Sequence, residues 1–350
     1  MRVLAEVVVL RGAIAESRHR VTAVTSAAAD TDAAPGPPLT TSFRSAAKPF
    51  QLLPFVERGH ADRLGCSVPE LAIMAASHSG SRAHLALVRG LLARIGLDET
   101  SLACGYHDPQ DPESLADVRR NPGLCGPLYN NCSGKHAGML AFCRAEGWPV
   151  EGYEKPGHPL QQLMLRTVAE CCGVAPQSVP TGIDGCGVPV FGMPLERMAH
   201  GYARIAAAGG GDTRDRALGR IAHAMMAEPV VVEGAGRLAT DLMLAAPGRL
   251  LAKSGAEGLL LVADTATGEG IAIKVEDGAM RALDPAAVEI LGRAGRIDPA
   301  LPGLAPHRRT VVTNAAGREV GWLEARVEPG GPAPRGPREK PHAPSDVRTG

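Results

Sequence analysis

The sequence predicts an α/β protein of the α+β type, in which one antiparallel sheet adjoins a long helical region. Two β-rich runs come first, at 3–10 and 17–24, joined around Gly12 as a hairpin. Strand patterns return after Lys253, whereas helical periodicity dominates between 42 and 250. Strands at both ends with helices between them indicate a sheet shared by the N- and C-terminal segments.

Each expected element follows from local pattern. Helices are predicted at 45–57, 69–76, 82–95, 133–146, 158–172, 194–208, 214–227 and 284–294. The later strands are predicted at 258–264, 270–276, 310–313 and 318–326. The Pro-, Gly- and Asp-rich stretch at 104–131 is too long for a simple connector, and such loops commonly build functional sites.

These elements predict one catalytic unit over 1–328. Its sheet would come from about 1–26 and 253–328, and its helical region from about 42–250. Residues 329–350 are rich in Pro, Gly and charge, so we expect a disordered tail there.

Composition excludes several classes of function. The 37 basic residues equal the 37 acidic ones in number, so no global positive field would hold nucleic acid. No segment approaches the roughly 18 apolar residues that span a bilayer, and Glu6 interrupts the apolar N-terminal run, which predicts a strand rather than a signal peptide. Eight cysteines without the spacing of a disulfide scaffold indicate the reducing cytoplasm, with free thiols or a metal.

Lysine is scarce, since only six of the 37 basic residues are lysines. Only an amine can lose its proton, act as a base and bind a metal, so lysines retained in an arginine-rich chain are candidates for such work. Three of them, Lys48, Lys135 and Lys253, lie among small Ser, Cys and Gly residues, and the others occur in ordinary surface-like contexts.

Ser45 and Lys48 are spaced i, i+3 at the start of an expected helix, so both side chains share one face. A desolvated lysine with a lowered pKa can take the proton of a serine and make its oxygen a nucleophile. This motif alone is a weak signal, because a Ser and a Lys at this spacing also occur by chance.

Cys132 and Cys186, each close to glycines, could supply half of a zinc site. Lys135 and His136 compete for the next ligand position, and on chemistry alone His136 is preferred because lysine binds a metal only as the neutral amine. In the alternative interpretation, both cysteines are small buried hydrophobic residues.

Three motifs occur in the order known from penicillin-recognising serine enzymes: Ser-x-x-Lys at 45–48, Tyr-x-Asn at 129–131 and Lys-Ser-Gly at 253–255. The segments at 42–49, 77–80, 129–136, 182–187 and 253–255 together resemble the asparaginase II family, the thermolabile rhizobial-type L-asparaginases. The resemblance runs from about residue 3 to 325, and the string YNNCSGKH at 129–136 is highly specific.

The resemblance implies a serine β-lactamase-like fold, two Ser/Lys pairs and a zinc ion. By position, the pairs are Ser45/Lys48 and Ser77/Lys253. The zinc ligands are Cys132, Lys135 and Cys186, so the resemblance places Lys135 rather than His136 on the metal. A homodimer is also implied.

The resulting hypothesis is hydrolysis of free L-asparagine to L-aspartate and ammonia. Ser45 would attack the carboxamide and Lys48 would take its proton. Ser77 with Lys253 would pass a proton to the departing ammonia. The substrate-binding candidates are Arg44 for its carboxylate, Asp184 for its ammonium, and His136 and Asn131 for the remaining polar lining. Two alternatives stay open: a glutaminase or another serine amidohydrolase of the same superfamily, and a non-catalytic zinc- or amino-acid-binding protein.

Overall fold

Seven antiparallel strands form the main sheet of the protein, as seen in a computed structural model that describes residues 2–30 and 38–328. The strand order is β6-β7-β8-β2-β1-β10-β9. The strands are β1 Arg2–Arg11, β2 Ile14–Ala27, β6 Leu250–Gly255, β7 Leu259–Asp264, β8 Glu269–Val275, β9 Val311–Thr313 and β10 Glu319–Val327. The predicted antiparallel sheet of N- and C-terminal strands is therefore confirmed, while the predicted tail at 329–350 lies outside the described residues.

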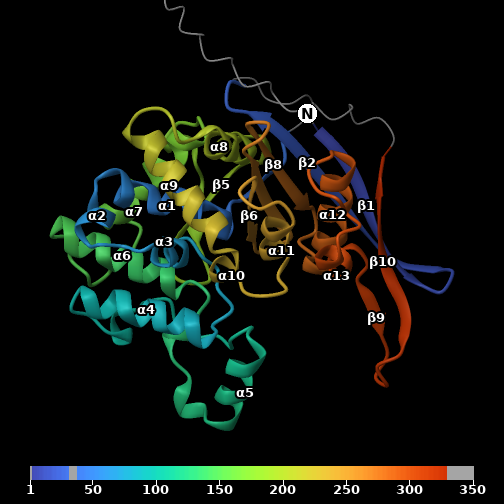
Figure 1. The fold of residues 1–350 in the computed structure, drawn as a ribbon, viewed down its shortest axis with the longest axis horizontal. Helices are drawn as coiled ribbons and strands as arrows, with labels where there is room; N and C mark the ends of the chain where they lie inside the picture. Colours follow the sequence, from blue (N-terminus) through green and yellow to red (C-terminus); the bar gives the residue numbers. More distant parts are fainter. Residues whose placement is uncertain (1, 31–37, 329–350) are drawn as a thin grey trace, which may run out of the picture.

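The terminal segments meet at the middle of this sheet. β1 pairs with β2 on one side and with β10 on the other, and β2 then pairs with β8. Figure 1 shows most helices grouped beside the sheet, and α8, α11 and α12 pack against its strands. The mixed architecture agrees with the predicted class, and its β-lactamase-like character stays a prediction.

All eight predicted helices are present, within a few residues of their predicted bounds, among thirteen helices in the part of the chain that the structure describes. They are α1 Lys48–Glu57, α2 His60–Arg63, α3 Val68–Met74, α4 Arg82–Arg94, α5 Pro112–Arg120, α6 Ser133–Glu146, α7 Pro159–Cys171, α8 Leu195–Ala207, α9 Thr213–Ala227, α10 Pro229–Val232, α11 Leu238–Ala245, α12 Leu283–Arg293 and α13 Ala305–Arg308. A 3₁₀ turn, η1 Arg44–Ala47, precedes α1. None of these helices combines the length and apolar character needed to cross a bilayer.

The structure also differs from the sequence prediction. The short helices α2, α5, α10, α11 and α13 were not predicted, and two features of the strands differ as well. A small sheet in the order β3-β5-β4 lies within the expected helical region, built from β3 Thr40–Ser42, β4 Thr181–Ile183 and β5 Pro189–Pro194. Lys253, which was expected to precede a strand, lies inside β6. Short strands rich in Gly and Pro have little alternating pattern, which explains why the sequence did not reveal the small sheet.

Close packing joins the sheet to the helical region. Every residue of β7 and β8 is buried, as are all residues of α6 from Ser133 to Cys143. α8 crosses β8 so closely that a Cβ atom at Gly270 would lie 1.9 Å from the Ala199 carbonyl oxygen. Only glycine fits this contact, so Gly270 fixes the distance between α8 and the sheet.

We therefore expect Gly270→Ala to lower the free energy of unfolding by about 1–3 kcal/mol or more, because backbone must move to admit the methyl group. Gly90→Ala is the matched control: Gly90 lies in α4, and a Cβ atom added there would have no neighbour within 4 Å. That change should stabilise the protein by up to about 1 kcal/mol through helix propensity. Urea unfolding of both variants measures these changes. Equal changes in the free energy of unfolding would contradict the close contact between Gly270 and α8.

Candidate active site

Ser45 lies in η1, at the point where the chain enters α1. Its neighbour Arg44 has φ of 44°, a left-handed conformation that is uncommon outside glycine. The Arg44 Nε donates a hydrogen bond of 3.0 Å to Asp184 Oδ1, and behind the turn the Tyr202 hydroxyl donates to the Ala46 carbonyl at 2.9 Å. A non-glycine residue in this conformation costs about 1–3 kcal/mol and persists only where the surrounding contacts hold it. Such residues cluster at functional sites.

The Lys48 amine is buried, with the residue only 1% exposed. Its Nζ donates to the Ala76 carbonyl at 2.5 Å and to the Ser77 Oγ at 2.8 Å. Burial lowers the pKa of Lys48 to about 8, even though the nearby Cys132 acts in the opposite direction. A neutral amine in contact with a serine hydroxyl is thus accessible near neutral pH.

The structure pairs the expected groups differently from the sequence hypothesis. Among the described residues, Lys48 makes its hydroxyl contact with Ser77, and no hydrogen bond joins it to Ser45. Lys253 is likewise not bonded to Ser77: its Nζ donates to Glu233 Oε1 at 2.7 Å and to the Ser254 carbonyl at 3.0 Å.

Glu233 is a site residue that the sequence analysis missed. It follows α10 and is 3% exposed, and its Oε1 also accepts the Ser254 N–H at 2.9 Å. Burial by itself would raise the pKa of Glu233, but the Lys253 cation and these hydrogen bonds outweigh it and lower the pKa. No local signal marks Glu233, because its partners are about twenty positions away in β6.

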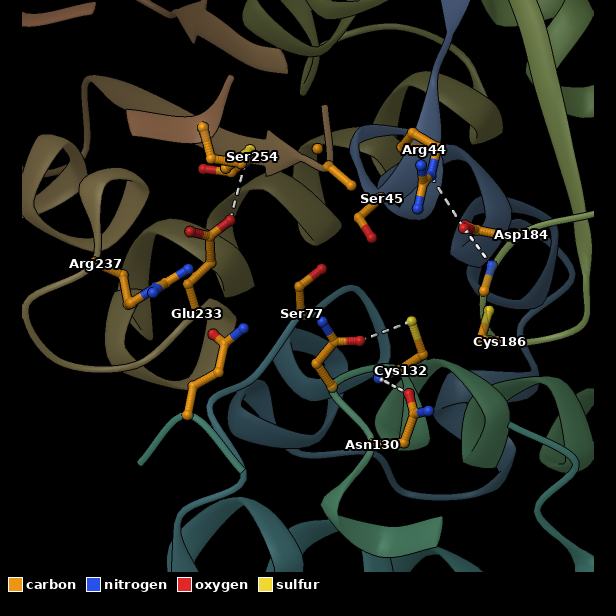
Figure 2. Close-up of a pocket in the computed structure, with 16 residues that line it drawn as sticks. Arg44, Ser45, Ser77, Asn130, Cys132, Asp184, Cys186, Glu233, Arg237 and Ser254 are labelled. Atoms are coloured by element: carbon orange, nitrogen blue, oxygen red, sulfur yellow. Dashed lines mark hydrogen bonds and ion pairs between the residues drawn. The ribbon is translucent and has the colours of Figure 1, made fainter. Parts of the chain in front are cut away.

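A cavity of about 450 Å³ brings these groups together. Ser45 and Ser77 both line it, and their hydroxyls point into it in Figure 2. Figure 2 also shows Arg44 and Asp184 on one side of these serines, with Glu233 and Arg237 on the other. The cavity is therefore polar at both ends, with two hydroxyl groups between them.

Cys132 and Cys186 lie at the Asp184 side of the cavity, next to Lys135. The Lys135 Nζ lies 3.0 Å from the Cys186 sulfur. The hydrogen bond between the two sulfurs lowers the pKa of Cys132 despite its burial, with help from the cations of Lys48 and Lys135. Burial by itself would lower the pKa of Lys135, but the charge interactions with both sulfurs outweigh burial and raise the pKa.

This donor set fits zinc in its chemistry. Within residues 2–30 and 38–328, no group of three or more His, Cys, Asp or Glu side chains could hold a metal ion. Two soft sulfur donors nevertheless converge with one amine, and thiolates are preferred zinc ligands. Lys135 would have to bind as the neutral amine.

The remaining predicted residues separate into two groups. Asn131 lines the cavity, and its side-chain Oδ1 lies 3.2 Å from the Cys132 sulfur. The structure places His136 behind the cavity wall, where it is fully buried and its Nδ1 lies 2.6 Å from the Tyr153 hydroxyl. His136 is not among the residues that line the cavity.

Comparison with known families identifies the class of protein. The family model of L-asparaginase II matches residues 7–325. The chain therefore belongs to the L-asparaginase II family, which makes it an asparaginase-type amidohydrolase that acts on a small molecule. None of the curated proteins compared with the chain matches it.

Breaking the buried ion pair of Lys253 and Glu233 is expected to lower the stability of the protein strongly. Glu233→Ala should lower the free energy of unfolding by about 3–5 kcal/mol, because it leaves the fully buried Lys253 ammonium without its carboxylate. Replacing both partners, as in Glu233→Leu with Lys253→Met, should recover most of that loss.

Glu289→Ala is the control for this measurement. It removes an exposed ion pair with Arg293 and should cost less than about 1 kcal/mol. Denaturant unfolding of the three variants provides the comparison, and a Glu233→Ala loss no larger than that of Glu289→Ala would show that the buried pair is not required.

Proposed function

We propose that this chain is an L-asparaginase, which hydrolyses the side-chain carboxamide of free L-asparagine to L-aspartate and ammonia. The observation that carries the proposal is the buried Lys48 amine, 2.8 Å from the Ser77 hydroxyl, in a cavity that Ser45 also faces. Membership of the L-asparaginase II family supports an amide as the bond that is broken.

The Arg44–Asp184 pair suits the α-groups of an amino acid. The two side chains lie 3.0 Å apart at one end of the cavity and are partly exposed to it. Arginine binds a carboxylate with paired hydrogen bonds, and an aspartate accepts hydrogen bonds from an ammonium. A substrate held there would direct its side chain toward the serines, with Asn131 completing the polar wall.

Ser45 is the attacking oxygen in this proposal. It lies in η1, directly before the N-terminus of α1, where the helix dipole favours negative charge, and the strained Arg44 turn directs its hydroxyl into the cavity. Ser77 contacts the Lys48 amine and faces the same cavity, so it would carry the Ser45 proton to Lys48. The C–N bond then breaks, ammonia leaves with that proton, and water hydrolyses the aspartyl ester.

Lys253 has a positioning role in this scheme. Its bond to Glu233 holds the carboxylate that also accepts the Ser254 N–H, so the pair fixes the wall of the cavity opposite Arg44. This differs from a direct Ser77–Lys253 proton relay, because the Lys253 amine is engaged by Glu233.

We further propose that Cys132, Lys135 and Cys186 hold a zinc ion. When bound, zinc would supply positive charge that fixes this corner of the cavity and orients the substrate. The proposal also includes a homodimer, as the family resemblance implies. It includes a cytoplasmic setting as well, because all eight cysteines are unpaired, which suits a reducing compartment.

Replacing the reacting groups gives the sharpest test of the chemistry. We expect Ser45→Ala to lower kcat for asparagine at least about 1,000-fold, and Lys48→Arg to lower it about 100- to 10,000-fold, since arginine keeps the charge but cannot take a proton. Ammonia release is the measurement. The control is Ser178→Ala, which changes an exposed serine outside the cavity lining.

Three outcomes would change the assignment. Activity near wild type in Ser45→Ala, with loss in Ser77→Ala, would make Ser77 the nucleophile. Faster turnover of glutamine than of asparagine would favour a glutaminase. Tight asparagine binding without ammonia release would favour a binding protein.

The zinc proposal predicts about one zinc ion per chain in purified protein. Cys132→Ser and Cys186→Ser should each remove it, because a neutral hydroxyl is a far weaker zinc ligand than a thiolate. Cys125→Ser is the control, since Cys125 is exposed and does not line the cavity. Elemental analysis provides the measurement, and full zinc content in both ligand variants would exclude this site.

A further inference from the structure

The active-site cavity continues into a second one on the Arg237 side. The second cavity has a volume of about 290 Å³ and shares Glu233, Arg237, Ser254 and Met280 with the first. The first cavity alone has a volume of about 450 Å³. Cavities of about 300–1,000 Å³ are typical for drug-sized ligands, so the space is larger than one free asparagine requires.

The proposed position of asparagine indicates which end of a larger substrate would enter the second cavity. Arg44 and Asp184 lie on one side of Ser45 and Ser77, and Arg237 lies on the other (Figure 2). A substrate whose α-groups bind Arg44 and Asp184 would present its scissile carbonyl to the serines. Its leaving nitrogen would then face Arg237 and the second cavity.

Arg237 differs in its hydrogen bonding from the other charged residues that line the second cavity. Three of its four charged lining residues have partners: Glu233 binds Lys253, Arg281 donates to Ser17 and His19, and Asp284 lies 2.8 Å from the His307 ring. Arg237 is exposed and makes no side-chain hydrogen bond or ion pair with any described residue. Its charge acts on the Glu233 carboxylate, but the hydrogen bonds of that carboxylate go to Lys253 and to the Ser254 N–H. The exposed Arg237 guanidinium at the junction of the two cavities therefore keeps its donors for a substrate carboxylate.

We propose that the substrate class extends to β-aspartyl amino acids, in which the leaving amine belongs to a second amino acid whose carboxylate binds Arg237. This inference rests on the proposed asparaginase chemistry. The Ser45 oxygen bonds to the β-carbonyl carbon, the C–N bond breaks, and the amine of the second amino acid leaves with the serine proton. Water then cleaves the ester, so that β-aspartyl amino acid and water give aspartate and an amino acid.

The test compares two substrates that differ only at the C-terminal group of the glycine, which is a carboxylate in one and a neutral amide in the other. Full-length wild-type protein is assayed for aspartate release from β-aspartyl-glycine, from β-aspartyl-glycinamide and from asparagine. We expect kcat/KM for β-aspartyl-glycine to exceed that for the glycinamide about 10- to 100-fold, as a hydrogen-bonded charge pair allows. Arg237→Ala should reduce this ratio to near one, and Arg237→Lys should retain part of it.

Each outcome decides the inference. Hydrolysis of asparagine without hydrolysis of β-aspartyl-glycine would overturn it while leaving the proposed function intact. Wild-type protein with nearly equal kcat/KM for β-aspartyl-glycine and β-aspartyl-glycinamide would also overturn it. An Arg237→Ala variant that keeps the wild-type ratio of these two values would do the same. Turnover of neither asparagine nor β-aspartyl-glycine would overturn the proposed function and this inference with it.

Discussion

The burial of the Lys48 amine between the Ala76 carbonyl and the Ser77 hydroxyl is the contact on which the proposed chemistry depends. It requires α1 to begin next to the end of α3, so that residues 48 and 76–77 meet inside the fold. The same burial that costs free energy for a charged amine brings its pKa to about 8. A lysine on the surface could not serve as a base near neutral pH in this way.

Three buried lysines converge on the cavity walls, and each has a different set of neighbours. Lys48 contacts a hydroxyl, Lys135 contacts a thiol, and Lys253 contacts a carboxylate. These environments suit three tasks: moving a proton, binding a metal and holding a wall in place. The differences come from the partners, because the three side chains are chemically identical.

The sequence predicted the sheet and most helices because their periodic patterns are long and strong. The scarcity of lysine and the small neighbours of Lys48, Lys135 and Lys253 also singled out these three residues, which are all buried in the structure. The sequence prediction was wrong about Lys274, which was expected in a surface-like context but is only 5% exposed in β8. The role of Glu233 and the Lys48–Ser77 contact depend on segments that are distant in the sequence, so no local sequence pattern could predict them.

The most direct test of the central claim is to trap the covalent intermediate. Wild-type enzyme would be quenched with acid during asparagine turnover and digested with a protease. The mass of the peptide that contains Ser45 would then be measured by mass spectrometry. The account predicts that this peptide gains the mass of an aspartyl ester on Ser45. An active enzyme whose Ser45 peptide stays unmodified, while the Ser77 peptide carries the ester, would contradict it.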